Sequence, residues 1–208
     1  MAEAPDWNWS AFAGGAECLK WNRRDVQTLD RVLGIVPFRR AAVQGGGNLG
    51  IFPKRLALEF DAVYAFEPDP ALFAIMCHNA PEPNIVKMQA ALGAKRDLVA
   101  TKHGTETRTH EGVTHIAGPG IIPTILVDDL GLPHCDLIYL DVEGWEYFAL
   151  QGAVDTIRRC RPIVACEINS CIRRVGLTGD DIRSFMASFG YVRAFRMRSD
   201  DVFVPGAA

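Results

Sequence analysis

Short runs of apolar and β-branched residues alternate along the chain with longer amphipathic stretches. This alternation is typical of a parallel sheet whose strands are joined by crossover helices. Apolar residues at helical spacing predict helices at about 25–35, 49–60, 70–79, 146–159 and 178–189. The expected strands are the apolar runs at 41–44, 62–66, 84–88, 136–140 and 162–167.

Three segments do not follow this alternation of apolar runs and amphipathic stretches. Residues 1–22 show no periodic pattern, and residues 93–123 are polar and end in GPGIIP, so we expect a β-hairpin or loop excursion at 93–123. Near the end of the chain, Ser199–Asp201 separates two strand-like halves, which predicts an antiparallel hairpin. We therefore expect one doubly wound α/β domain over residues 1–208. It has about five parallel strands, a terminal hairpin, and residues 1–24 as a candidate lid.

The composition is ordinary for a globular protein, with 208 residues, 49 % apolar and 23 % charged, and a formal net charge of −3. This balance gives no overall attraction to nucleic acid or to an anionic membrane, and the arginine clusters are short. The six cysteines lack metal-binding spacing, so we expect free thiols. The sequence shows no signal-peptide pattern and no apolar run long enough to span a bilayer, so we expect a cytoplasmic protein.

A glycine-rich stretch, VQGGGNLG at residues 43–50, follows the first expected strand. Gly45, Gly47 and Gly50 have the GxGxxG spacing of dinucleotide-binding loops, and Glu67 ends the next strand, where an acid would take ribose hydroxyls. The stretch also suits the loop of S-adenosylmethionine methyltransferases, in which glycine lets the backbone approach the cofactor. A third interpretation is a turn that only permits tight strand–helix packing. No Lys-Ser/Thr pair follows the glycines, which excludes a P-loop.

Several motifs, taken in order, resemble those of the FkbM-type methyltransferases. They are VQGGGNLG, AFEPDP, Asn79, TILVDDL, LIYLDVEGWEYFALQGA and RPIVACE, and they span about residues 41–170. The most specific part is DVEG-x-E followed by LQGA. The resemblance implies the class I methyltransferase fold, which is Rossmann-like, with S-adenosyl-L-methionine as the cofactor and a hydroxyl oxygen as the acceptor. A dehydrogenase fits less well, because it would normally need more chain for a substrate domain.

The resemblance also implies which residues form the site. The expected cofactor contacts are the loop residues Gln44, Gly46, Gly47, Asn48 and Gly50, then Glu67 at the ribose, Ala91 and Leu92 at the adenine, and Asp141. The expected catalytic carboxylates are Asp141, Glu143 and Glu167. The expected substrate contacts are Glu146, Trp145 and His115, of which Trp145 could equally be a core residue.

Two positions depart from the family pattern. Gln44 stands where the family carries an acid, so it can accept a hydrogen bond but supplies no charge for the methionine ammonium group. Tyr139 stands where lysine is usual, and it either alters substrate choice or repacks a strand.

Methyl transfer to a hydroxyl requires positioning and a base. Asp141 and Glu143 lie at the carboxyl end of an expected strand, where ligands bind in open α/β sheets. An alternative is an acid pair that complements a helix N-terminus. A divalent metal held by Asp141, Glu167 and Asn169 is a further alternative, ranked below metal-free catalysis.

The sequence therefore predicts an O-methyltransferase that acts on a small-molecule or glycan acceptor. Two other classes stay open: a methyltransferase for a nucleotide, nucleic acid or protein, and a non-catalytic module that binds S-adenosylmethionine.

Overall fold

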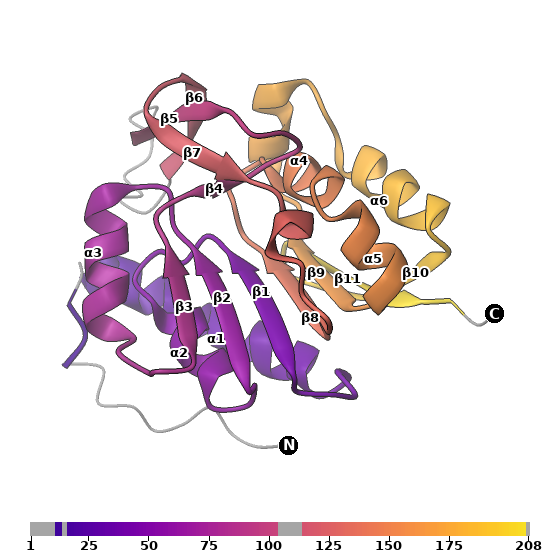
Figure 1. Ribbon diagram of the computed structural model, residues 1–208, viewed down its shortest axis with the longest axis horizontal. Coiled ribbons are helices and arrows are strands. Elements are labelled where there is room, and N and C mark those ends of the chain that lie inside the picture. The colour runs from indigo at the N-terminus through magenta and orange to yellow at the C-terminus, as the bar shows by residue number, and fades with distance from the viewer. Residues whose placement is uncertain (1–10, 14–15, 104–113, 207–208) are drawn as a thin grey trace.

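The computed structural model describes residues 11–13, 16–103 and 114–206. A seven-stranded sheet has the order β10-β11-β9-β8-β1-β2-β3 (Figure 1). A terminal hairpin of β10 (Tyr191–Met197) and β11 (Asp200–Pro205) joins β9 in antiparallel fashion. The predicted doubly wound α/β fold, ending in a hairpin, is thereby confirmed. The five parallel strands are β1 (Ala41–Gly45), β2 (Ala62–Phe66), β3 (Ile85–Met88), β8 (Leu137–Leu140) and β9 (Ile163–Glu167).

Helices cover both faces of this sheet because its central strands are apolar on both sides. In β8, Leu137 and Tyr139 belong to one buried cluster, whereas Ile138 and Leu140 belong to the other. The first face carries α1 (Ala16–Leu33), α2 (Ile51–Ala57) and α3 (Pro70–Asn79). The second carries η2 (Val127–Leu130), α4 (Glu146–Gln151), α5 (Val154–Cys160), η3 (Ser170–Val175) and α6 (Gly179–Ser188).

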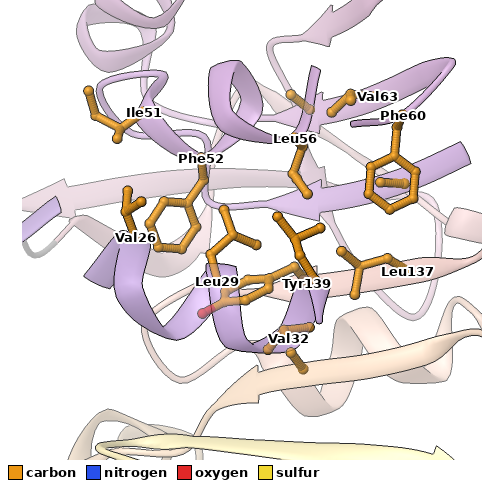
Figure 2. Close-up of a cluster of buried hydrophobic side chains, with 14 of the residues drawn as sticks. Val26, Leu29, Val32, Ile51, Phe52, Leu56, Phe60, Val63, Leu137 and Tyr139 are labelled. Carbon is orange, nitrogen blue, oxygen red and sulfur yellow. The ribbon is translucent and has the colours of Figure 1, made fainter. Parts of the chain in front are cut away.

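Tyr139 belongs to the core of the first face. Figure 2 shows its ring among side chains from α1, α2 and β8. The ring of Phe52 meets it edge-on, with 5.2 Å between ring centroids. The Tyr139 hydroxyl donates to Oδ1 of Asp200 across 3.3 Å, and the residue is 1 % exposed. Of the two interpretations of Tyr139, the structure therefore supports strand packing.

Two helix predictions were wrong in their bounds. The first helix begins at Ala16 rather than near residue 25, so residues 16–22 are not irregular. This extra length is built from good helix formers, and Leu19 packs against the buried cluster of the first face. The predicted helix over 146–159 is two helices, α4 and α5, separated at Gly152.

Tertiary contacts explain the break at Gly152. Its carbonyl accepts from the Asp128 amide, and a Cβ atom on Gly152 would lie 2.0 Å from the carbonyl oxygen of Gly93. The carboxylate of Asp128 then accepts from the amides of Asp155 and Thr156, in the first turn of α5. A residue distant in sequence therefore caps the second helix.

A second, four-stranded sheet has the order β4-β7-β5-β6. The predicted hairpin within 93–123 is confirmed as β5 (Leu98–His103) and β6 (Thr114–Pro119), although residues 104–113 of that segment lie outside the described residues. The sequence analysis did not predict β4 (Ala91–Leu92) or β7 (Ile122–Ile125). Figure 1 shows this sheet beyond the carboxyl ends of β1 and β2. Within the described residues, no helix is both long and apolar enough to cross a bilayer.

Candidate active site

A cleft opens at the carboxyl ends of β1, β2 and β8. The strand order reverses between β1 and β8, and such switch points are where open α/β sheets bind ligands. Most of the residues expected to form the site line this cleft together. They are Gly46, Asn48, Glu67, Ala91, Leu92, His115, Asp141, Glu143 and Trp145.

The glycines of the loop after β1 are required by protein packing. Gly46 has φ +85°, and a Cβ atom there would lie 1.8 Å from the carbonyl oxygen of Asp141. A Cβ atom on Gly47 would lie 2.2 Å from the sulfur of Met76 in α3. The interpretation as a tight packing turn therefore holds for these two glycines. Gly46 also presents its backbone to the cleft, but Gly47 and Gly50 are not among the residues that line it.

The buried side chain of Gln44 is hydrogen-bonded to the backbone of this loop. The residue has no exposed surface, and its Nε2 atom donates to the carbonyls of Gly45 and Gly46 across 3.0 and 2.9 Å. A carboxylate could not donate these two hydrogen bonds. Oε1 of Gln44 is buried without a hydrogen-bond partner within the described residues. Gln44 does not line the cleft, and its observed role is to tie two loop carbonyls together.

Glu67 ends β2 and places a buried carboxyl group in the cleft wall. Its two oxygens accept from the backbone amides of Asn48 and Asp69, across 2.7 and 2.9 Å. Burial raises the pKa of Glu67 to about 7, although these two hydrogen bonds act in the opposite direction. Beside it, Phe66, Ala91 and Leu92 form an apolar wall.

Asp141, Glu143 and Glu167 form a carboxylate cluster where β8 and β9 end; Asp141 and Glu143 line the cleft, whereas Glu167 does not. Each offers one oxygen, and the three oxygens lie within 4.8 Å of one another. Burial raises the pKa of Asp141 well above its usual range, and the neighbouring charges of Glu167 and Glu143 raise it further. Burial and the charge of Glu167 also raise the pKa of Glu143. Within the cluster, the protonated form of Asp141 is therefore favoured more than in an exposed aspartate.

Of the three side chains that hold this cluster, Asn169 was named from the sequence as a possible metal ligand, whereas Ser199 and Cys171 were not predicted. Ser199 donates to one oxygen of Glu167 across 2.8 Å, and the Asn169 amide donates to the other across 2.6 Å. Oδ1 of Asn169 accepts from the Cys171 amide, so it caps η3. The Cys171 thiol lies 3.2 Å from Oε2 of Glu143, and burial raises its pKa to about 12, so it donates.

Neither Ser199 nor Cys171 belongs to a motif that could have indicated this role. Glu143 itself has φ +54°, a left-handed conformation that is uncommon for a non-glycine residue. The structure brings Glu143 together with Asp141 and Glu167, and Asn169 lies against Glu167 with its Oδ1 atom bonded to the Cys171 amide.

Glu146 stabilises the turn between β8 and α4. It is 1 % exposed, and its Oε1 atom accepts from the amides of Val142 and Gly144 across 3.0 and 3.2 Å. It is not among the residues that line the cleft. The structure therefore gives Glu146 a structural position instead of the predicted place at the substrate.

Trp145 and His115 line the cleft on the side of the second sheet. Nε1 of Trp145 and Nδ1 of His115 are buried, and neither has a hydrogen-bond partner within the described part of the chain. Burial lowers the pKa of His115, and the charges of Arg174 and Lys102 lower it further, so its imidazole is neutral at pH 7. Both rings therefore offer polar atoms to a ligand.

The buried carboxyl groups make the stability of the fold depend on pH. Burial raises the pKa values of Glu67, Glu146 and Asp200 to about 7, whereas in the unfolded chain such groups ionise near about 4. Because the folded-state pKa is the higher one, their stabilisation is complete below about pH 4 and is lost as the pH rises through about 7. We expect the urea midpoint of unfolding to be lower at about pH 8 than at about pH 5.

Glu146→Gln supplies the control for this pH dependence, because glutamine can still accept from the two turn amides but does not ionise. We expect a smaller pH dependence in this variant. Glu59→Gln changes a carboxyl group outside the cleft, so its urea midpoint should depend on pH as strongly as that of the wild type. A midpoint that rises from pH 5 to pH 8 would contradict the raised pKa values.

Comparison with known proteins agrees with this geometry. A family model described as the Methyltransferase FkbM domain matches residues 55–193, which is more than half of the chain. The search of curated proteins found no match.

Among solved structures, methyltransferase FkbM from Methylobacillus flagellatus KT matches with a TM-score of 0.57 and 15 % identity. The match covers 94 % of this chain and 56 % of that one. Magnesium protoporphyrin IX methyltransferase from Synechocystis PCC 6803, crystallised with bound S-adenosylmethionine, matches with a TM-score of 0.52 and 11 % identity. This match covers 94 % of this chain and 86 % of that one. These structures share the fold, and the family model places the sequence: the chain belongs to the FkbM methyltransferase domain family, whose members are S-adenosylmethionine-dependent methyltransferases.

Proposed function

We propose that this protein transfers a methyl group from S-adenosylmethionine to a hydroxyl oxygen of a small molecule or glycan. The observation that carries the proposal is the division of one cleft into two ends. Glu67 follows β2, at one end of the strand row β2-β1-β8, and Asp141 and Glu143 follow β8, at the other end. The first end suits a nucleoside, and the second suits a reaction that releases a proton.

The residues at the first end fit the nucleoside part of the cofactor. The Glu67 carboxyl group can accept from two ribose hydroxyls, because each of its oxygens has a lone pair beyond the one given to Asn48 or Asp69. Ala91 and Leu92 offer an apolar surface of the kind that an adenine ring covers. The backbone of Gly46 is open to the cleft where the methionine part would lie.

When bound, S-adenosylmethionine supplies an activated methyl group on a positively charged sulfur. In the proposed reaction the acceptor oxygen bonds to the methyl carbon as the carbon–sulfur bond breaks, and the sulfur keeps the electron pair. The hydroxyl proton passes to the Asp141 carboxylate, whose raised pKa makes it a stronger base than an exposed aspartate. Glu143 and Glu167 keep that pKa high by their charge.

A screen for release of S-adenosylhomocysteine tests this proposal directly. The panel contains phenols, aliphatic alcohols, sugars, nucleosides and peptides, each with the matched compound in which the hydroxyl is replaced by hydrogen. We expect turnover only with hydroxyl compounds. Turnover on a nucleoside base nitrogen or a peptide amine would contradict O-methylation, and cofactor binding without any turnover would favour the non-catalytic module.

Cofactor binding should depend on Glu67 and on pH. We expect Glu67→Ala to weaken binding of S-adenosylhomocysteine by about 1.5–3 kcal/mol for each ribose hydrogen bond lost, measured by calorimetry. Hydroxyl donors favour the ionised carboxylate, so wild-type affinity should rise as the pH passes through about 7, the pKa of Glu67. Binding to Glu67→Ala should not change over this range.

Glu59→Ala is the matched control for this experiment, because Glu59 pairs with Arg55 outside the cleft. It should bind S-adenosylhomocysteine like the wild type. Wild-type affinity in Glu67→Ala would show that the ribose is held elsewhere, and saturable binding of NAD with no response to S-adenosylhomocysteine would overturn the cofactor assignment.

A further inference from the structure

A second groove adjoins the cleft on the side of the smaller sheet. It is open to solvent and is lined mainly by apolar atoms from β5, β6, the link between β4 and β5, and α4. Trp145 and Ile116 line both the groove and the cleft, so the two are continuous. The Trp145 ring packs against that of Phe148, with 4.3 Å between centroids, and these rings form one wall.

The polar side chains of the groove are already paired. Lys95 and Asp97 form an ion pair with one another at 2.9 Å, so they cancel in charge. The Thr124 hydroxyl donates to the Lys95 carbonyl and accepts from the Asp97 amide, both at 2.7 Å. A sugar needs several hydrogen-bonding side chains, and a nucleic acid needs unpaired positive charge. Here the single positive charge, on Lys95, is paired with Asp97, and the Thr124 hydroxyl is already engaged by the backbone.

One polar atom at the junction of groove and cleft has no partner. The indole N–H of Trp145 is buried and makes no hydrogen bond within the described residues. It can only donate. A ligand that lies in the groove and reaches toward Asp141 passes Trp145, so an oxygen on that ligand could accept from this donor.

We infer that this groove binds the apolar body of the methyl acceptor, and that the acceptor is an aromatic hydroxyl compound and not a glycan. The aromatic body lies between the Trp145–Phe148 wall and the side chains of β5, of which Leu98 is 54 % exposed. Its oxygen accepts from the indole N–H of Trp145 and extends toward the carboxylate cluster. The inference rests on the proposed O-methylation for the fate of this oxygen, but not for the binding itself.

Calorimetric titration with 1-naphthol tests the groove without turnover. Full-length protein saturated with S-adenosylhomocysteine should bind 1-naphthol at one saturable site and should not bind methyl glucoside. Leu98→Asp places a charge in the groove at an exposed position, so we expect affinity to fall by about tenfold or more with the fold retained. Leu58→Asp is the matched control, because Leu58 is 56 % exposed and does not line the groove.

Trp145→Phe keeps a ring in the wall and removes the donor. We expect it to weaken 1-naphthol binding by about 2- to 10-fold, the range for one hydrogen bond. Trp21→Phe, at an exposed tryptophan of α1, should leave binding unchanged.

Absence of saturable 1-naphthol binding, equal affinities in Leu98→Asp and Leu58→Asp, or equal binding of methyl glucoside would each overturn the inference. The outcome is separate from that of the proposed function. If 1-naphthol binds in the groove but no hydroxyl compound is methylated, the groove assignment stands and O-methylation fails. If phenols and sugars are both methylated but Leu98→Asp changes neither rate, O-methylation stands and the groove assignment fails.

Discussion

Asp141→Asn should lower the turnover number by about 10²–10⁴-fold, the usual contribution of general-base catalysis. Asparagine keeps the shape of the side chain at the end of β8 but cannot take the proton of the acceptor hydroxyl. Affinity for S-adenosylhomocysteine should change little, because asparagine keeps the size of the side chain and Glu67 follows β2, on the far side of β1 from β8. The measurement is S-adenosylhomocysteine release with the hydroxyl compound that gives the highest wild-type rate.

Asp155→Asn provides the matched control, since Asp155 is an exposed residue of α5 whose side chain is 81 % accessible. It should retain the wild-type rate. Glu143→Gln should have a smaller effect than Asp141→Asn, because Glu143 acts mainly through its charge. If a metal held by the cluster is involved, a chelator should abolish activity and magnesium should restore it. Full turnover of Asp141→Asn, with or without chelator, would contradict both mechanisms.

Gly46→Ala should destabilise the protein by about 3 kcal/mol or more and should abolish cofactor binding. The new Cβ atom would lie 1.8 Å from the carbonyl oxygen of Asp141, and φ at this position is +85°. The atoms that the new Cβ atom would meet belong to the backbone of Asp141, so the loop or the end of β8 must move. Urea denaturation measures the loss of stability, and calorimetry with S-adenosylhomocysteine measures the loss of binding.

Gly176→Ala separates the two causes. Gly176 has φ +75°, but no atom of the described residues lies within 4 Å of a Cβ atom built there. This variant should therefore show only the cost of a left-handed alanine, about 1–2 kcal/mol. If Gly46→Ala and Gly176→Ala lost the same stability, the contact with Asp141 would contribute nothing to the loss in Gly46→Ala. Normal cofactor binding by Gly46→Ala would show that the loop can shift without harm to the cleft.

The sheet was predictable from sequence because its strands are buried on both faces. The strand β9 is continuously apolar from Ile163 to Cys166, and the alternation of such runs with amphipathic stretches leaves few other arrangements. The helix α6 was predictable for a local reason, since Thr178 and Asp181 form a capping box within one turn. The break between α4 and α5 was not predictable, because Asp128 caps α5 from an element distant in the sequence.

The residues lining the cleft were also largely predictable, because parallel strands end at one edge and bring their terminal residues together. The motifs stand at the ends of expected strands and identified Glu67, Asp141 and Glu143, and all three line the cleft. Their environment was not predictable from local sequence. The raised pKa of Asp141 arises from burial and from a neighbour on another strand, Glu167.

Only the tertiary structure distinguishes side chains that face the cleft from those that support it. Gln44 and Glu146 stand in motifs with cleft-lining residues, yet both turn inward to hold backbone groups of their own loops. The second sheet is a further case in which sequence alone was not enough. A polar excursion was evident from composition, but the apolar groove forms only because β5 and α4, which carry Leu98 and Phe148, line the same space. Periodicity reports which residues are buried by their own element, whereas a site depends on contacts between elements that are distant in sequence.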